Sequence, residues 1–241
     1  MNLSHERYLE TIAKESAALA TAARGNLDDR VPSCPEWKMS DLVAHIGEVQ
    51  RFWGEIARRG LTDPRATERH DPPTSIDLVQ WFLDGAHGLV ETLRDIDLER
   101  EIWTWSRERT IAFVPRRMAQ EVAVHGWDAR NAVGDPSPIA TDVAVDGIDE
   151  LLSVWLPAMA PLKEAPSTSL HLHTTDAEGE WLVVLEEEPV VTREHAKGDA
   201  AVRGPASDLF LWMWGRVPPE ALEIHGDPAV LEQFCGFFDL E

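Results

Sequence analysis

The chain has 241 residues, 44% of them hydrophobic and 27% charged, which is typical of a globular protein with one large or two small domains. Its formal net charge of −21 and pI near 4.7 argue against nucleic acid and anionic membranes as partners, because both bind basic surfaces. The sequence shows no signal peptide and no long apolar span, and its two cysteines form no motif, so we expect a reducing, cytoplasmic location.

Amphipathic patterns predict four long helices in the first half of the chain, over about residues 4–23, 40–59, 75–93 and 115–133. Ser40 is expected to cap the second helix, with Asp41 in its first turn, and Ser75 is expected to cap the third. The stretch 26–39 contains two prolines and is expected to be a loop. Four helices of this length with modest connections predict a four-helix bundle.

The pattern changes after the proline-rich segment 135–138. Alternating and β-branched residues predict short strands over 170–173, 181–185, 190–193, 201–203 and 222–225. Helices are expected over 142–155 and 206–214 and after Asp227. The fold class predicted is therefore α+β in two domains: a four-helix bundle over 1–138, and a small α+β domain with a mainly antiparallel sheet over 139–241.

Three acidic or imidazole side chains share one face of the predicted fourth helix. Each helical residue turns by roughly 100°, so Glu121, His125 and Asp128 project in similar directions. A carboxylate and an imidazole one turn apart suit a divalent metal, and Asp128 would accept the other ring N–H of a histidine ligand. The alternative is a solvated helix face with mixed charges, because this spacing is a weak signal by itself.

Metal sites in bundles are built by facing helices, so a further ligand is expected on another helix. The candidates are His45 on the second helix and His87, with Asp84, on the third. His45 is preferred because it lies in the middle of an apolar stripe, whereas His87 lies at the edge of its own. A hydrogen-bonded core histidine is the alternative for His45.

Four segments carry a resemblance to a known family: Val31–His45, Arg117–Asp128, Asp146–Leu151 and Gly204–Arg216. They resemble the mycothiol-dependent maleylpyruvate isomerase family, whose N-terminal domain is a DinB-like metal-binding bundle and whose C-terminal domain is similar to sterol-carrier proteins. The resemblance implies that His45, Glu121 and His125 hold a metal, usually zinc. It also implies that Asp128 lies near this site and that Arg216 serves the active site.

The family uses mycothiol, a small thiol, as its cofactor. Two histidines and a carboxylate leave a position open on zinc, and a thiol bound there is deprotonated. The thiolate can add to a cis double bond, which leads to isomerisation, or remain on an electrophile, which is S-transfer. Arg216 would bind a substrate carboxylate or stabilise enolate charge; the alternative is a structural ion pair, for example with Asp208.

Other interpretations stay open at this point. The same donor set would allow hydrolysis by zinc-bound water, or a non-catalytic zinc or apolar-ligand protein. Cys34 would favour the non-catalytic interpretation if it completed the zinc tetrahedron, although packing of its loop is the simpler expectation. Iron, nickel or manganese would also accept these ligands. His171 and His173 alternate on one predicted strand; without a carboxylate nearby they would make a poor second metal site, so they are expected to be surface residues.

Overall fold

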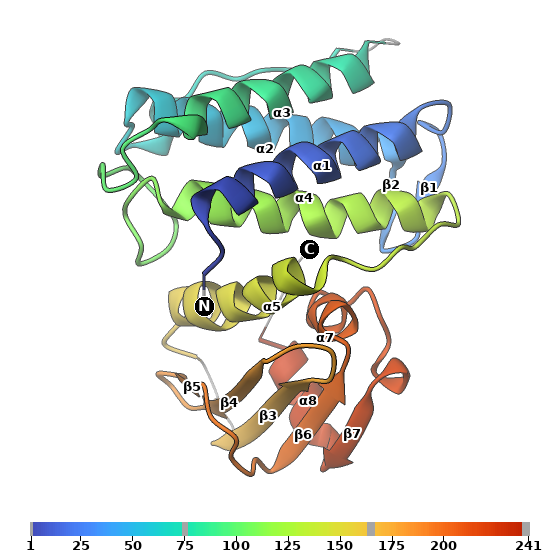
Figure 1. Ribbon diagram of the computed structural model, residues 1–241, viewed down its shortest axis with the longest axis vertical. Helices are drawn as coiled ribbons and strands as arrows, with labels where there is room; N and C mark the ends of the chain where they lie inside the picture. The colour runs from blue at the N-terminus through green and yellow to red at the C-terminus, as the bar shows by residue number, and fades with distance from the viewer. Residues whose placement is uncertain (1, 74–76, 163–166, 238–241) are drawn as a thin grey trace. The chain divides into compact units, whose positions relative to one another are not determined.

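The structure is a computed structural model that describes residues 2–73, 77–162 and 167–237. It divides into two compact units, Asn2–Ser137 and Pro138–Glu241 (Figure 1). The first is helical and the second combines helices with a sheet, so the predicted α+β class is confirmed. Ser75, predicted to cap a helix, lies outside the described residues. No helix within the described ranges is long and apolar enough to cross a membrane.

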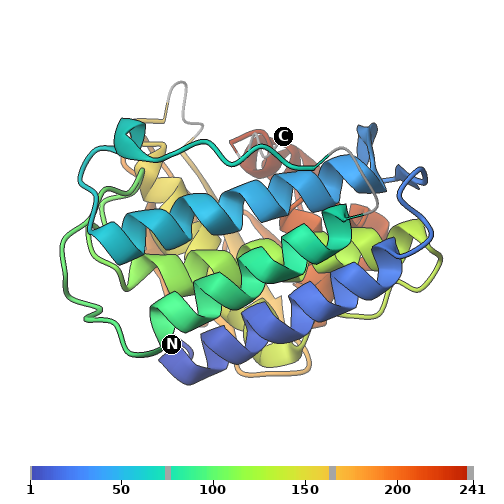
Figure 2. The ribbon, with the colours of Figure 1, turned by 90° about the horizontal axis from the view of Figure 1, so that it is seen from above.

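The first unit is a bundle of four long helices: α1 (His5–Ala23), α2 (Met39–Arg59), α3 (Leu78–Arg94) and α4 (Phe113–Ala132). In the bundle α1 and α2 each pack against both α3 and α4, an arrangement visible in Figure 2. Ser4 caps α1 by accepting a hydrogen bond from the Arg7 N–H. Gly60, at the end of α2, adopts the left-handed conformation (φ +67°) that glycine tolerates best. A short 3₁₀ turn, η1 (Pro64–Ala66), follows α2.

Two predictions for the segment before α2 were wrong. Residues 26–39 are not simply a loop, because β1 (Arg30–Val31) and β2 (Cys34–Lys38) form an antiparallel hairpin packed against α2 and α4. Ser40 is not the N-cap, since α2 already begins at Met39. The Asp41 carboxylate, in the first turn of α2, instead accepts a hydrogen bond from the Lys38 N–H at 2.8 Å. The N-terminus of α2 is therefore capped by a residue of its own first turn.

Apolar side chains spaced along all four helices fill the bundle interior. Those with no exposed surface include Ile12, Leu19, Leu42, Ile46, Ile56, Phe82, Leu93, Met118 and Val122. Burial of this apolar surface is the main term that stabilises a bundle, at roughly 25 cal/mol per Å² removed from water. The helices are therefore held rigidly enough to fix polar side chains that point inward from α2 and α4.

The second unit contains a five-stranded sheet and several helices (Figure 1). Its helical segments are α5 (Thr141–Glu150), a π-helical turn η2 (Leu151–Trp155), α6 (Leu156–Ala158), α7 (Ala206–Met213), a 3₁₀ turn η3 (Pro219–Ala221) and α8 (Pro228–Cys235). Its strands are β3 (Thr168–Thr174), β4 (Glu180–Leu185), β5 (Val190–Thr192), β6 (Ala200–Gly204) and β7 (Glu223–Gly226). The strand order is β5-β4-β3-β6-β7, antiparallel except between β3 and β6.

The two faces of this sheet differ in composition because successive residues of a strand point in opposite directions. One face carries buried apolar side chains, with α7 and α8 packed against the central strands: Leu170, Leu172, Trp181, Val183 and Val202. The other face carries His171 and His173 of β3 and Glu180 of β4. The sheet thus has one core face and one polar face.

Candidate metal centre

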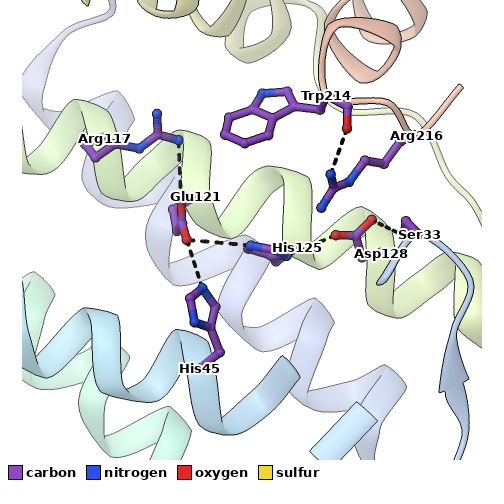
Figure 3. Close-up of polar contacts among 8 residues, drawn as sticks. All are labelled: Ser33, His45, Arg117, Glu121, His125, Asp128, Trp214 and Arg216. Atoms are coloured by element: carbon purple, nitrogen blue, oxygen red, sulfur yellow. Dashed lines mark hydrogen bonds and ion pairs between the residues drawn. The ribbon is translucent and has the colours of Figure 1, made fainter. Parts of the chain in front are cut away.

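Three potential metal ligands converge between two helices of the bundle. His45 extends from α2, and Glu121 and His125 extend from successive turns of α4 toward it (Figure 3). The Glu121 Oε1 atom lies 3.4 Å from His45 Nε2 and 3.6 Å from His125 Nε2. The donor atoms of all three residues lie within 4.8 Å of one another.

These spacings fit a bound divalent metal. Ligand bonds of about 2.1 Å to zinc place neighbouring donors of a tetrahedron about 3.4 Å apart. The two measured separations, 3.4 and 3.6 Å, are close to that edge length. The cluster could therefore accept a cation with only small side-chain movements. Nitrogen and carboxylate donors of this kind suit zinc and other first-row divalent metals.

Asp128 controls the orientation of His125. Its Oδ2 atom lies 3.0 Å from His125 Nδ1, and its Oδ1 atom accepts a hydrogen bond from the Ser33 hydroxyl (Figure 3). Asp128 is fully buried, so this carboxylate is held in a fixed position. A proton on Nδ1 directed at Asp128 leaves the lone pair of Nε2 aimed at the cluster, as in carboxylate–histidine–metal triads.

The same contacts determine the charges of the cluster. Burial alone would lower the pKa of His125, but the carboxylates of Asp128 and Glu121 outweigh it and raise this pKa from 6.5 to about 9. Burial alone would raise the pKa of Glu121, but His125, His45 and Arg117 hold it well below its ordinary value. The centre therefore combines an ionised Glu121 with a His125 ring that stays protonated at neutral pH when no metal is bound.

The hairpin before α2 covers one side of the cluster. The Trp37 ring of β2 packs against His45 and His125, with centroid distances of 5.0 and 6.3 Å. Cys34, on the same strand, forms no disulfide with another described residue, and it does not belong to the donor group formed by the three predicted ligands. Sequence reasoning missed Trp37 and Ser33 as neighbours of the cluster because it treated this segment as a loop.

The other candidates lie elsewhere. His87 is exposed on α3, and Asp84, also exposed, accepts a hydrogen bond from the Gln80 side chain. Arg216 follows α7 in the second unit, where its Nη1 donates to the Trp214 carbonyl oxygen at 2.7 Å. The structure thus brings His45, Glu121, His125 and Asp128 together within the bundle and leaves His87 outside this group.

One further expectation was wrong. The sequence predicts His171 and His173 as surface residues without a carboxylate nearby, but His171 is only 6% exposed, and Glu180 lies directly opposite His173 in the pairing of β3 with β4. Glu180 is seven residues from His173 in the sequence, and the hairpin register brings them together. Predicting the register of the β3–β4 hairpin would have placed Glu180 opposite His173.

The fold and the donor cluster define a protein in which a four-helix bundle with a metal-compatible His/Glu/His set precedes a small α+β unit. Residues 9–130 match the model of the mycothiol maleylpyruvate isomerase N-terminal domain, and residues 142–233 match that of the MDMPI C-terminal domain. The chain belongs to the mycothiol maleylpyruvate isomerase family, as the sequence motifs predicted.

Solved structures agree with this assignment at the level of the fold. A crystal structure of the mycothiol-dependent maleylpyruvate isomerase is 13% identical and superposes with a TM-score of 0.63, covering 92% of this chain and 93% of that chain. A mutant of that enzyme gives the same TM-score and coverage at 12% identity. A UbiJ-SCP2 ubiquinone synthesis protein, 21% identical over 41% of this chain and 90% of its own, has a TM-score of 0.29, too low to indicate a shared fold. No curated protein matches the chain significantly.

Proposed function

We propose that this protein is a divalent-metal-dependent enzyme that uses mycothiol to isomerise a small, carboxylate-bearing electrophile about a cis double bond. The observation that carries the proposal is the spacing of His45, Glu121 and His125. This spacing suits a metal, and it occurs in a chain whose two regions both match mycothiol maleylpyruvate isomerase models. Neither cysteine forms a disulfide among the described residues, which is consistent with a cytoplasmic location.

His45, Glu121 and His125 would hold the metal, for which zinc is the first candidate. Three protein ligands leave a fourth position for an exogenous group, which is the pattern of catalytic rather than structural zinc. When bound, the metal would supply the positive field that keeps a small thiol in its nucleophilic thiolate form near neutral pH. Asp128 would hold the proton on Nδ1 of His125 and thereby keep the Nε2 lone pair directed inward.

The isomerisation that we propose conserves the thiol. The thiolate sulfur forms a bond to one alkene carbon, and the displaced electron pair moves onto the conjugated carbonyl oxygen. Rotation then occurs about the resulting carbon–carbon single bond. Return of the electron pair breaks the carbon–sulfur bond and releases the trans product with the thiolate. S-transfer would stop after the first step: a proton from solvent would add to the enolate carbon, and the sulfur would stay on the product.

Arg216 is the proposed residue for substrate binding. Its planar guanidinium presents five N–H donors and can bind a carboxylate with two parallel hydrogen bonds. The Trp214 carbonyl oxygen accepts one of its hydrogen bonds, which limits the freedom of the side chain. A cation in this role would also stabilise the negative charge that develops on the carbonyl oxygen during thiolate addition.

The test is incubation of the zinc-loaded protein with mycothiol and a panel of cis-configured unsaturated dicarboxylates. We expect conversion to the trans isomers without net loss of thiol. Accumulation of an S-conjugate would assign S-transfer instead, and hydrolysis products would assign zinc-activated water. The absence of every product would refute an enzymatic role toward these compounds.

Two variants make the test specific to the centre. His45→Ala should lose the metal of this centre and at least 100-fold of kcat/KM, because one of three ligands is removed. His87→Ala is the matched control, since His87 is an exposed histidine on the same bundle. Equal activity of the two variants would contradict the assignment of the centre.

A further inference from the structure

A second cluster of metal-type ligands lies on the polar face of the C-terminal sheet. The antiparallel register of β3 and β4 sets His173 opposite Glu180, so both side chains point to the same face. His171, two residues before His173 on β3, points to that face as well. His195 reaches the same place from the segment between β5 and β6.

The donor atoms of these four residues are close together. His173 Nδ1 lies 3.0 Å and His195 Nδ1 lies 3.1 Å from the same Glu180 oxygen, Oε1. The His171 ring lies 5.4 Å from that of His195 and 6.1 Å from that of His173, measured between centroids. One donor atom from each of the four residues lies within 4.8 Å of every other.

His171 shows that these contacts are not merely surface ion pairs. Pairing with Glu180 accounts for His173, which is partly exposed, and for His195, which is exposed. His171 is only 6% exposed, and its Nε2 atom is buried without a hydrogen-bond partner among the described residues. A buried polar atom left unpaired destabilises the fold, whereas a metal ion bound to this ring would give one of its nitrogens a partner.

We propose that His171, His173, Glu180 and His195 form a second metal site, separate from the bundle centre, that binds a transition-metal dication such as Zn²⁺. Three imidazoles and one carboxylate suit zinc, nickel or copper, whereas calcium and magnesium prefer all-oxygen sites. Four protein ligands complete a zinc tetrahedron, as in structural sites. The ion would therefore stabilise the fold and would not activate a thiol.

The expected consequence is local. His195 is the only one of the four ligands outside the paired strands, so the ion would fix the segment 193–199 to the sheet. This segment borders a hollow of about 320 Å³ lined by residues that include His171, His195, Lys197 and Asp199. Binding of the ion would order one wall of this hollow.

The experiment uses the full chain and zinc alone as the probe. The bundle centre is first disabled by H45A together with H125A, and the protein is treated with a chelator and then dialysed against zinc. We expect one equivalent of zinc by elemental analysis and a zinc-dependent rise in the melting temperature. Adding H195A should abolish both, and E180Q should weaken zinc binding at least tenfold.

His195 is the most useful position because its side chain is 80% exposed, so its removal leaves the core unchanged. H225A is the matched control: His225 lies on β7, is 59% exposed and pairs with Glu223 on its own strand. Circular dichroism checks that every variant folds. The proposal is overturned if the bundle-disabled protein binds no zinc, or if H195A retains the equivalent that the H225A control retains.

Discussion

The replacement of Asp128 by asparagine tests how this carboxylate sets the pKa of His125 and the zinc affinity of the bundle centre. Asn has nearly the same shape as Asp but lacks the charge that helps to raise the pKa of His125 to about 9. In Asp128→Asn we therefore expect this pKa to fall toward the ordinary value of 6.5 in the metal-free protein. The substitution also removes the carboxylate that holds the Nδ1 proton of His125.

These two effects change zinc affinity in opposite directions. With a pKa of about 9, His125 is about 99% protonated near pH 7, so protons lower the apparent zinc affinity about 100-fold. Asp128→Asn relieves most of this competition but loses the outer carboxylate, typically worth about 10–100-fold in metal affinity. The wild-type and variant affinities should thus lie within about tenfold near pH 7. Above about pH 9 the wild type should bind about 10–100-fold tighter.

The assay is competition for zinc against a chromophoric chelator over this pH range, with NMR titration of the His125 ring in the metal-free state. Ser33→Ala is the control, because it removes the hydrogen bond to Asp128 but keeps the carboxylate beside His125. A ratio of affinities that does not change with pH, or a His125 pKa that does not move, would refute the reasoning.

The stability of the metal-free protein gives an independent check. The folded-state pKa of His125 lies above its unfolded value, so protonation of this ring stabilises the fold. That contribution is fully present below about pH 6.5 and is lost as the pH rises through about 9. Urea unfolding should show this loss in the wild type, and Asp128→Asn should show much less of it.

Further predictions concern the packing of the bundle. In Gly47→Ala the new methyl group would overlap the Trp81 ring, so we expect a loss of about 1–3 kcal/mol by urea unfolding. Gly54→Ala, on the same helix, has its nearest neighbour at 3.6 Å and should be neutral or stabilising by up to about 1 kcal/mol. Arg130→Ala should lower the free energy of unfolding by about 3 kcal/mol, because the largely buried Glu15 carboxylate loses its 2.8 Å partner. The double variant Glu15→Ala/Arg130→Ala should lose less stability than the two single variants lose in total. If its loss equals or exceeds that total, this explanation fails.

Local sequence patterns determined most of the helices and strands of this protein. The periodicity of apolar residues gave the four bundle helices, and alternation gave all five strands of the C-terminal sheet. The spacing of Glu121, His125 and Asp128 also set their common face, because helix geometry depends only on separation along the chain. The division into domains over 1–138 and 139–241 remains our proposal, and it rests on the change of pattern near Pro138.

Only the tertiary structure decided the features that depend on contacts between residues far apart in the sequence. The β1–β2 hairpin is too short to show an alternating pattern and depends on contacts with α2 and α4, so the loop prediction failed there. The approach of His45 to α4 likewise follows from the packing of two helices. The sequence favoured His45 over His87, but it could not show this contact. Strand register places Glu180 beside His171 and His173, and the segment between β5 and β6 brings His195 to the same face. Both arise only when the sheet forms, so spacing along the chain alone does not show this cluster.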